Sequence, residues 1–267
     1  MPGVGPTLAA AYEERRSALV GYLPAGFPTV DGSIAVVRAM VEAGVDVVEV
    51  GLPYSDPVMD GPTIQAAAET ALAAGTRTSD VLQVVEAVAE LAPTLVMTYW
   101  NPVERYGVER FAADLAAAGG AGLITPDLLP EEADDWLAAA DQHDLDRVFL
   151  VAPSSSPERL RLTTQQCRGF VYATAVMGVT GARETTSAAA PELVGRVREV
   201  TRHPVGVGLG VSNGSQAAEV ASYADAVIVG SAFVRAVSEP ATPDPSAAIE
   251  AVSAVAADLA RGVRREL

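Results

Sequence analysis

The stretch VDVVEVGLPYSDPVMDGPTIQ, at residues 45–65, changes character twice along its length. It begins as a β-branched apolar run, breaks into a loop rich in Gly and Pro, and ends where an Ala-rich segment starts. Such a run is typical of a buried strand, and an Ala-rich segment is typical of a helix. We therefore expect a strand, a loop and a helix in succession, with Glu49 at the end of the strand and Asp60 on the loop.

The two carboxylates in this stretch favour acid/base chemistry. A carboxyl group in water is a poor proton donor at neutral pH, but partial burial raises its pKa. Glu49 and Asp60 are therefore candidate catalytic residues. The residues alone leave a plainer interpretation open, in which Glu49 only completes a strand while Asp56 and Asp60 make turns.

Short β-branched runs alternate with Ala-rich or amphipathic segments along the whole chain. Continuous apolar strands separated by helices indicate a parallel sheet that is covered on its faces. We expect strands near Ala18–Leu23, Val45–Val50, Leu95–Thr98, Gly122–Thr125, Arg147–Val151, Phe170–Ala173, Val205–Gly208 and Ala226–Val229. Helices are expected at Ser33–Ala43, Thr63–Ala74, Asp80–Leu91, Val108–Ala118, Glu131–Gln142 and Pro191–Thr201.

Eight such units without a break in composition predict an α/β fold, a single (β/α)8 TIM barrel over residues 1–267. An extra N-terminal helix, Leu8–Ser17, is expected to cross the barrel floor. Near the end of the chain, the Pro-rich run at 238–245 precedes a last helix, Ser246–Arg261. We interpret that run as a connector, since too little chain follows it to form a second core.

The composition excludes several classes of partner. The 267 residues include 34 Asp and Glu against 18 Lys and Arg, a net charge of −16. This charge repels nucleic acid and anionic lipid surfaces. The chain has no apolar run of the roughly 18 residues that a membrane span needs, and its first residues do not resemble an export signal. These features favour a soluble, cytoplasmic protein.

Rare and missing residue types limit the chemistry further. With Cys167 as the only cysteine, no internal disulfide or CxxC metal site can form, and His143 and His203 are too few for an ordinary histidine zinc site. No metal is expected. All 18 basic residues are arginine, so the chain has no lysine to form a Schiff base or to anchor pyridoxal phosphate. Phosphate would have to bind to backbone N–H groups, helix N-termini or Arg.

Two glycine-rich loops occur where barrel enzymes often hold phosphate, after strands seven and eight. They are GLGVSNG at 208–214 and VGSAF at 229–233, and Ser212 or Ser231 could cap the helix that follows each loop. A dinucleotide site is a weaker interpretation, because Val211 stands where a third glycine belongs. Tight turns without a ligand also remain open. The long loop 172–187 after strand six is typical of a lid, or of a mere connector.

Several segments together carry a family resemblance. Beside residues 49–65, they are PAGFPT at 24–29, MTYWNP at 97–102, ITPDL at 124–128, VAP at 151–153, GVTGAR at 178–183 and VGSAFV at 229–234. Over essentially its full length, the sequence resembles the alpha chain of tryptophan synthase. The resemblance implies a retro-aldol cleavage of indole-3-glycerol phosphate to indole and glyceraldehyde 3-phosphate.

The resemblance also implies roles for individual residues. Glu49 matches the acid/base that protonates indole C3 and takes the proton of the glycerol 3′-hydroxyl. Asp60 matches the carboxylate that faces the indole N–H, and Tyr172 an active-site tyrosine. The remaining matches are a lid residue that meets Asp60 on closure, a phosphate cradle and a partner-facing surface: Thr180 for the lid, Gly181, Gly210, Gly230 and Ser231 for the cradle, and Pro53, Asp56 and Asn101 for the surface.

By the same resemblance, the expected partner is a tryptophan synthase beta chain in an α2β2 complex. The alpha chain needs no cofactor of its own, and pyridoxal phosphate is expected only on the beta chain. Indole would pass to that chain through a tunnel.

Departures from the family pattern concern the lid and the pocket. Ala175, Val176 and Met177 stand where the family usually has Ser and a polar or small pair, Leu209 where an aromatic is common, and Pro24 where Thr is frequent. Two other functions stay open: a lyase that acts alone and releases indole, and a degenerate chain that only binds and activates a beta partner. A generic phosphate-binding isomerase would not account for residues 49–65.

Overall fold

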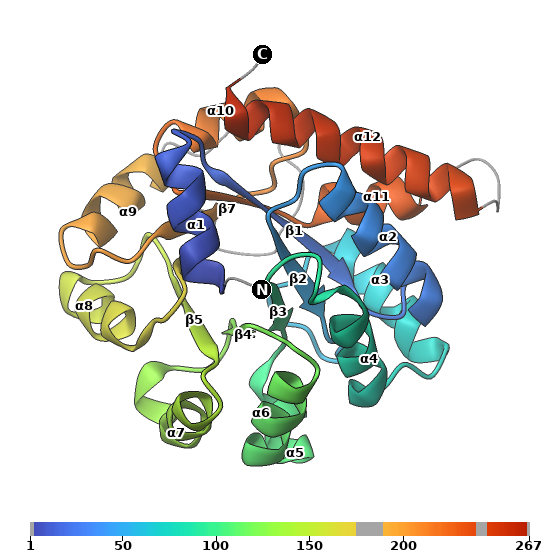
Figure 1. Ribbon diagram of the computed structural model, residues 1–267. Helices are drawn as coiled ribbons and strands as arrows, with labels where there is room; N and C mark the ends of the chain where they lie inside the picture. Colours follow the sequence, from blue (N-terminus) through green and yellow to red (C-terminus); the bar gives the residue numbers. More distant parts are fainter. Residues whose placement is uncertain (1–2, 175–188, 239–244, 266–267) are drawn as a thin grey trace.

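A closed barrel of eight parallel strands forms the centre of the molecule (Figure 1). The computed structural model describes residues 3–174, 189–238 and 245–265. Each strand pairs with the next along the chain, and β1 pairs with β8 to close the ring. The strands are β1 (Ala18–Pro24), β2 (Val47–Gly51), β3 (Thr94–Met97), β4 (Gly122–Thr125), β5 (Asp146–Val151), β6 (Val171–Thr174), β7 (Val205–Gly208) and β8 (Ala226–Val229).

Helices surround the barrel in chain order, as Figure 1 shows. They are α1 (Val4–Glu13), α2 (Val30–Glu42), α3 (Pro62–Ala73), α4 (Thr78–Val88), α5 (Trp100–Tyr106), α6 (Val108–Ala117), α7 (Asp134–Gln142), α8 (Pro157–Gln166), α9 (Ala189–Arg198), α10 (Gly214–Ala221), α11 (Ser231–Ser238) and α12 (Pro245–Arg264). A 3-10 turn, Pro130–Glu132, precedes α7. The predicted (β/α)8 fold is confirmed. That residues 1–267 form one domain stays a prediction, since the segments between the described ranges are not covered.

The barrel interior and the shell between strands and helices are two separate apolar clusters. The larger cluster packs helices such as α4 against the outer face of the strands, with Val81, Val84 and Val88 fully buried. The smaller fills the interior: Ala18, Val20, Val47, Leu95, Ile124, Val148, Ala226 and Ile228 from the strands, Phe170 from the residue before β6, and Val4, Leu8 and Ala11 from α1. Because side chains alternate along a strand, the residue two beyond Val47 also faces inward.

The extra N-terminal helix crosses the barrel floor as predicted, but its predicted bounds, Leu8–Ser17, are wrong. It runs from Val4 to Glu13 and ends in a turn that reverses the chain into β1. In that turn the Arg15 N–H donates to the Tyr12 carbonyl (2.9 Å) and the Arg16 N–H to the Ala11 carbonyl (3.1 Å). This pair of bonds is the Schellman arrangement, which closes a helix with one left-handed residue. Arg15 is that residue, with φ 59°.

The other predicted elements lie close to their observed positions. All eight strands are present with ends within two residues of prediction. The helix predicted at Glu131–Gln142 begins instead with the 3-10 turn, and α7 itself starts at Asp134. The sequence interpretation did not name α5, α8, α10 or α11, each of ten residues or fewer. Among the described residues, no helix is both long and apolar enough to cross a membrane.

Helices α10 and α12 touch through their backbones at two glycines. A Cβ atom on Gly262 would lie 2.1 Å from the carbonyl oxygen of Gly214, and one on Gly214 would lie 2.5 Å from that of Asp258. The Gly214 N–H, at the start of α10, donates to the Asp258 carboxylate (2.6 Å). The absence of side chains at both positions is therefore what allows α12 to lie on α10.

Replacing Gly262 by Ala should lower the free energy of unfolding, by about 2–3 kcal/mol, because the new methyl group must push two backbones apart. The matched control is Gly195→Ala in α9, where nothing lies within 4 Å of the new Cβ. That change should raise the free energy of unfolding by about 0.5–1 kcal/mol through the lower flexibility of the unfolded chain. Urea unfolding measures both, and equal effects would contradict the close contact.

Candidate active site

Glu49 places a carboxyl group inside the barrel near the carboxyl end of β2. Within the sheet, Glu49 is paired with Tyr22 of β1 on one side and with Leu95 of β3 on the other. It is inward-facing by alternation with Val47, and only 1% of its surface is exposed. The β-branched run on either side of it forms the strand that carries the carboxyl group into this position.

The environment of Glu49 favours its protonated form. Its Oε1 atom is buried without a hydrogen-bond partner among the described residues. Burial in surroundings that cannot solvate a negative charge raises the pKa of Glu49 from 4.5 to about 8. At neutral pH the group therefore carries a proton that it can donate.

Asp60 lies on the loop between β2 and α3 and is only partly buried. Gln65, one turn into α3, holds the backbone there by donating its side-chain amide to the Asp60 carbonyl (2.8 Å). Burial raises the pKa of Asp60 from 3.8 to about 6, against the lowering effect of a hydrogen bond from the Tyr99 side chain. Asp60 is therefore ionised at neutral pH while Glu49 is not, and this contrast suits an acid and an electrostatic stabiliser in one site.

Tyr99 holds the loop that carries Asp60, and sequence reasoning missed it. Its hydroxyl oxygen accepts the backbone N–H groups of Val58 (3.1 Å) and Met59 (2.9 Å). With its oxygen facing these donors, the hydroxyl proton is available to the Asp60 carboxylate. The available signal was its place two residues beyond β3, where barrel enzymes carry functional side chains.

Tyr22 and Tyr172 stand beside both carboxylates. Burial raises the pKa of each hydroxyl well above its usual value, and the charges of Glu49 and Asp60 raise both further. Both carboxylates must therefore lie near the same two rings. Tyr172 was predicted, whereas Tyr22 was missed, although by alternation with Val20 it faces the barrel interior.

Two glycines make room for these rings. A Cβ atom on Gly51 would lie 2.3 Å from the Tyr22 hydroxyl oxygen, and one on Gly208 would lie 2.6 Å from that of Tyr172. Any side chain at either position would displace a tyrosine that lies against the carboxylates.

The loops after β7 and β8 have the backbone character expected of an anion cradle. Gly210 is left-handed, with φ 80°, and Gly230 precedes Ser231, the first residue of α11. The first N–H groups of a helix have no acceptor within it and can bind an anion. A Cβ atom on Gly230 would lie 3.3 Å from the Tyr22 ring, so this loop adjoins the carboxylates.

Neither Ser212 nor Ser231 takes the cap position predicted for it, and Ser231 is instead the first residue of α11. Asn213, not Ser212, caps α10 by accepting the Gln216 N–H (2.9 Å). The Ser212 N–H and hydroxyl instead lie within hydrogen-bond distance of the Gln216 side-chain oxygen, at 2.8 and 3.0 Å. Ser231 is almost fully buried at the start of α11, and Leu209, a departure from the family pattern, is buried as well.

The predicted lid lies outside the described residues. Thr180 and Gly181 therefore stay predictions, as do the departures at Ala175, Val176 and Met177. In the described part of the chain, no group of three or more His, Cys, Asp or Glu residues is arranged to hold a metal ion.

The three residues predicted to face a partner separate into two kinds. Asp56 and Asn101 are exposed and line one hollow of about 590 Å³, together with Tyr54 and Arg105. Pro53 is buried under the loop. The Tyr54 ring packs on the Tyr99 ring, with centroids 5.4 Å apart. Tyr54, which lines the hollow, therefore links it to Tyr99, the residue that bonds Asp60.

Comparisons with known proteins agree with one another. The model of the family described as tryptophan synthase alpha chain matches residues 8–264. The chain is 62% identical to the tryptophan synthase alpha chain of Acidothermus cellulolyticus, over 99% of this chain and 98% of that one. It is also 62% identical to that of Nocardia farcinica, over 97% and 94%. A solved structure of Mycobacterium tuberculosis tryptophan synthase superposes with a TM-score of 0.92 at 57% identity, covering 98% of both chains.

The buried Glu49 should make stability depend on pH. Because its folded pKa, about 8, lies above the usual 4.5, it favours folding fully below pH 4.5, and this contribution is lost as the pH rises toward 8. Glu49→Gln cannot ionise. The free energy of unfolding of Glu49→Gln, compared with that of the wild type at the same pH, should therefore rise by about 3 kcal/mol between pH 5.5 and 8.

Urea unfolding at several pH values measures this gain. The control is Glu158→Gln, an exposed carboxyl group at the start of α8. Its difference from the wild type should stay constant over the same range. A constant difference for Glu49→Gln as well would contradict the raised pKa.

Proposed function

The chain belongs to the tryptophan synthase alpha chain family, and we propose that Glu49 and Asp60 perform its cleavage of indole-3-glycerol phosphate. The chain is a lyase of tryptophan biosynthesis. The observation that carries the assignment of these residues is their different burial: Glu49 is 1% exposed, with Oε1 lacking a hydrogen-bond partner among the described residues, whereas Asp60 is partly exposed on a loop. This difference gives them opposite protonation at neutral pH. One carboxyl group can give a proton while the other stabilises positive charge.

Glu49 is the acid and then the base. It donates its proton to indole C3, which turns the ring into an electron sink. The bond between C3 and the glycerol C3′ then breaks, its electron pair returns to the ring, and Glu49 takes the proton of the 3′-hydroxyl as the aldehyde forms. Glu49 ends as it began, and the raised pKa brings it close to the working pH, where such transfers are efficient. No lysine imine is needed, and the chain has no lysine.

Asp60 stabilises the cation that this protonation creates. A carboxylate with a pKa of about 6 is mostly ionised at neutral pH and can accept the indole N–H. A fixed negative charge beside the ring acts on the transition state more than on the neutral substrate. The Tyr99 hydroxyl lowers the pKa of Asp60 against the larger effect of burial, and it holds the loop in place.

Gly210, Gly230 and Ser231 bind the phosphate end of the substrate, together with Thr180 and Gly181 of the lid. Their support is the left-handed Gly210 and the helix start at Ser231, which present backbone N–H groups without a competing side chain. Binding the phosphate at a distance from the reacting bond holds the glycerol chain in position.

The partner is a tryptophan synthase beta chain, in an α2β2 complex in the cytoplasm. Asp56 and Asn101 would contact it from the rim of their hollow, and Tyr54 would transmit contact to Tyr99 and so to Asp60. The alpha reaction needs no cofactor on this chain, since Glu49 supplies the proton, and pyridoxal phosphate belongs to the beta chain.

Indole release from indole-3-glycerol phosphate, measured without and then with a beta chain, tests the function. We expect slow release that rises strongly with the partner, and abolition of both rates by Glu49→Gln in a folded, ligand-binding protein. Fast release that ignores the partner would identify a lyase that acts alone. No release in either case would identify a chain that only activates its partner.

The hydrogen bond from Tyr99 should show in the pH dependence of the reaction. With Asp60 ionised and Glu49 protonated, kcat/KM should be bell-shaped, rising near pH 6 and falling near pH 8. Tyr99→Phe removes a bond to the ionised form of Asp60, so the acid limb should move to higher pH while the alkaline limb stays. Tyr54→Phe, which keeps the Tyr99 hydroxyl, is the control. An acid limb unmoved by Tyr99→Phe would remove Tyr99 from this role.

A further inference from the structure

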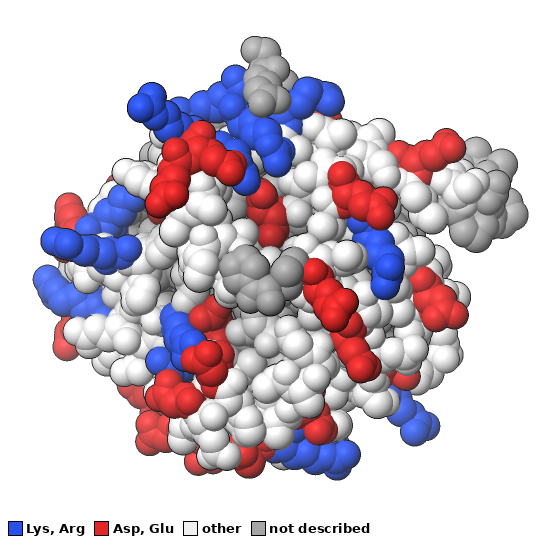
Figure 2. All heavy atoms as spheres, in the orientation of Figure 1, with Lys and Arg blue, Asp and Glu red and all other residues white. Residues whose placement is uncertain are grey.

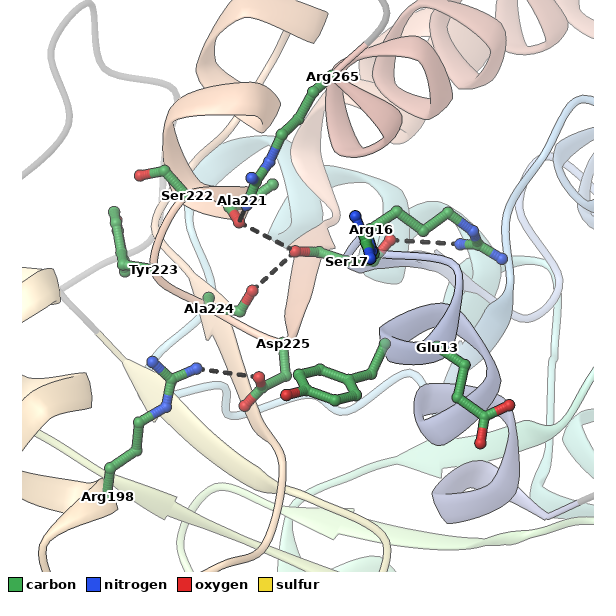
Figure 3. Close-up of a pocket in the computed structure, with 12 residues that line it drawn as sticks. Glu13, Arg16, Ser17, Arg198, Ala221, Ser222, Tyr223, Ala224, Asp225 and Arg265 are labelled. Carbon is green, nitrogen blue, oxygen red and sulfur yellow. Dashed lines mark hydrogen bonds and ion pairs between the residues drawn. The ribbon is translucent and has the colours of Figure 1, made fainter.

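A second hollow lies at the opposite end of the barrel, among the segments that lead into the strands. It measures about 480 Å³, a size common for small-molecule sites. Its walls are the end of α1, the residues before β1, the turn between α10 and β8, the end of α9 and the residue after α12. Figure 3 shows Arg265 and Arg198 entering from opposite sides of that turn.

Arginines gather at the hollow, although the chain is acidic. Arg15, Arg16, Arg198 and Arg265 line it together with Glu13 and Asp225, and two further carboxylates, Asp46 and Glu14, bind Arg16 from outside the hollow. The chain as a whole carries −16. Figure 2 shows basic side chains gathered beside the C-terminal end of α12, whereas acidic ones are spread over the other helices in view.

The four arginines are not equally engaged. Arg16 is a fixed wall, because its guanidinium donates to both oxygens of Asp46 (2.8 and 2.9 Å) and to Glu14 (2.6 Å). Arg198 uses one nitrogen on Asp225 (2.9 Å), and Arg265 uses one on the Ala221 carbonyl (2.7 Å). Within the described part of the chain, Arg15 and Arg265 have no carboxylate partner. Three guanidinium groups therefore keep donors for a ligand.

Two of these arginines have a backbone conformation that is unfavourable for any residue with a side chain. Arg15 and Arg265 each follow a helix in the left-handed conformation, with φ 59° and 58°. Glycine is the usual residue there because a Cβ atom makes the conformation unfavourable. This chain follows the usual rule after α2, α3, α5 and α6, where the left-handed residues are Gly44, Gly75, Gly107 and Gly119. Among the described residues, three positions after helices carry a left-handed residue other than glycine: Asp144 after α7, and Arg15 and Arg265, both of which line this one hollow.

We propose that this hollow binds a phosphate-bearing small molecule, at a site separate from the active site. A phosphate monoester carries close to two negative charges at neutral pH and has several oxygens that can accept guanidinium donors at once. Arginine forms paired hydrogen bonds to phosphate oxygens, and three arginines with free donors face the hollow. The size of the hollow suits a small molecule, and the ligand would join the ends of α1, α9 and α12.

Inorganic phosphate is the probe, titrated at constant ionic strength and followed through backbone amide signals in NMR spectra. The Gly230→Asp background removes the proposed catalytic cradle, so that only the second site remains. In that background, we expect saturable shifts at Ser17 and Tyr223. Adding Arg15→Gly and Arg265→Gly should weaken binding at least tenfold. Because glycine suits both turns, these two changes should leave the midpoint of thermal unfolding no lower.

The control pair is Arg38→Gln with Arg110→Gln, which removes two charges far from the hollow and should leave the affinity unchanged. Equal weakening by the control pair, or shifts that sodium chloride reproduces, would overturn the proposal. Loss of all phosphate binding in Gly230→Asp would also overturn it while supporting the catalytic cradle. If Gly230→Asp leaves phosphate binding as it is in the wild type, and the two arginine changes then abolish it, the result would support the second site and count against the cradle.

Discussion

The active end of the barrel depends on one unfavourable burial, that of the Glu49 carboxyl group. Its Oε1 atom has no hydrogen-bond partner among the described residues, and the strand on which it sits is paired on both sides. A charge in that position would be poorly solvated, so the group keeps its proton at a pH where an exposed glutamate would lose it. The stability that is lost as Glu49 ionises is the physical source of its raised pKa. The neighbouring tyrosines maintain this state by filling the space that water would occupy.

Asp60 is set to the opposite state by its place on a loop. The loop leaves it partly exposed, and Tyr99 supplies a hydrogen bond to its ionised form. Two carboxyl groups eleven positions apart in the chain thus receive different proton affinities from a strand and a loop. The aromatic contact from Tyr54 to Tyr99 joins the neighbouring hollow to the residue that bonds Asp60.

The two ends of the barrel differ in how they handle charge. At the carboxyl ends of the strands, Glu49 is buried and Asp60 partly buried beside tyrosines, and we propose that backbone N–H groups bind the phosphate there. At the other end, arginines supply the positive charge directly, two of them from turns where glycine would be easier to accommodate. Some motif residues serve the frame instead: the Asp127 carboxylate accepts the Trp100 N–H (2.9 Å) and so holds the start of α5.

The sequence by itself determined the strand order, the place of Glu49 at the end of a strand and the loops that adjoin it, because the period of apolar residues and the places of Gly and Pro are local properties of the chain. Which face of the strand Glu49 occupies was decided by the structure. It did not reveal Tyr22 and Tyr99, whose roles come from strands and loops that meet only when the barrel closes. Nor did it reveal that Arg15, Arg198 and Arg265 line one hollow. Those residues are separated by most of the chain, and only closure of β1 against β8, with α12 laid across α10, brings them together. Proton affinities were decided at the same step, since they depend on what surrounds a carboxyl group and not on its neighbours in sequence.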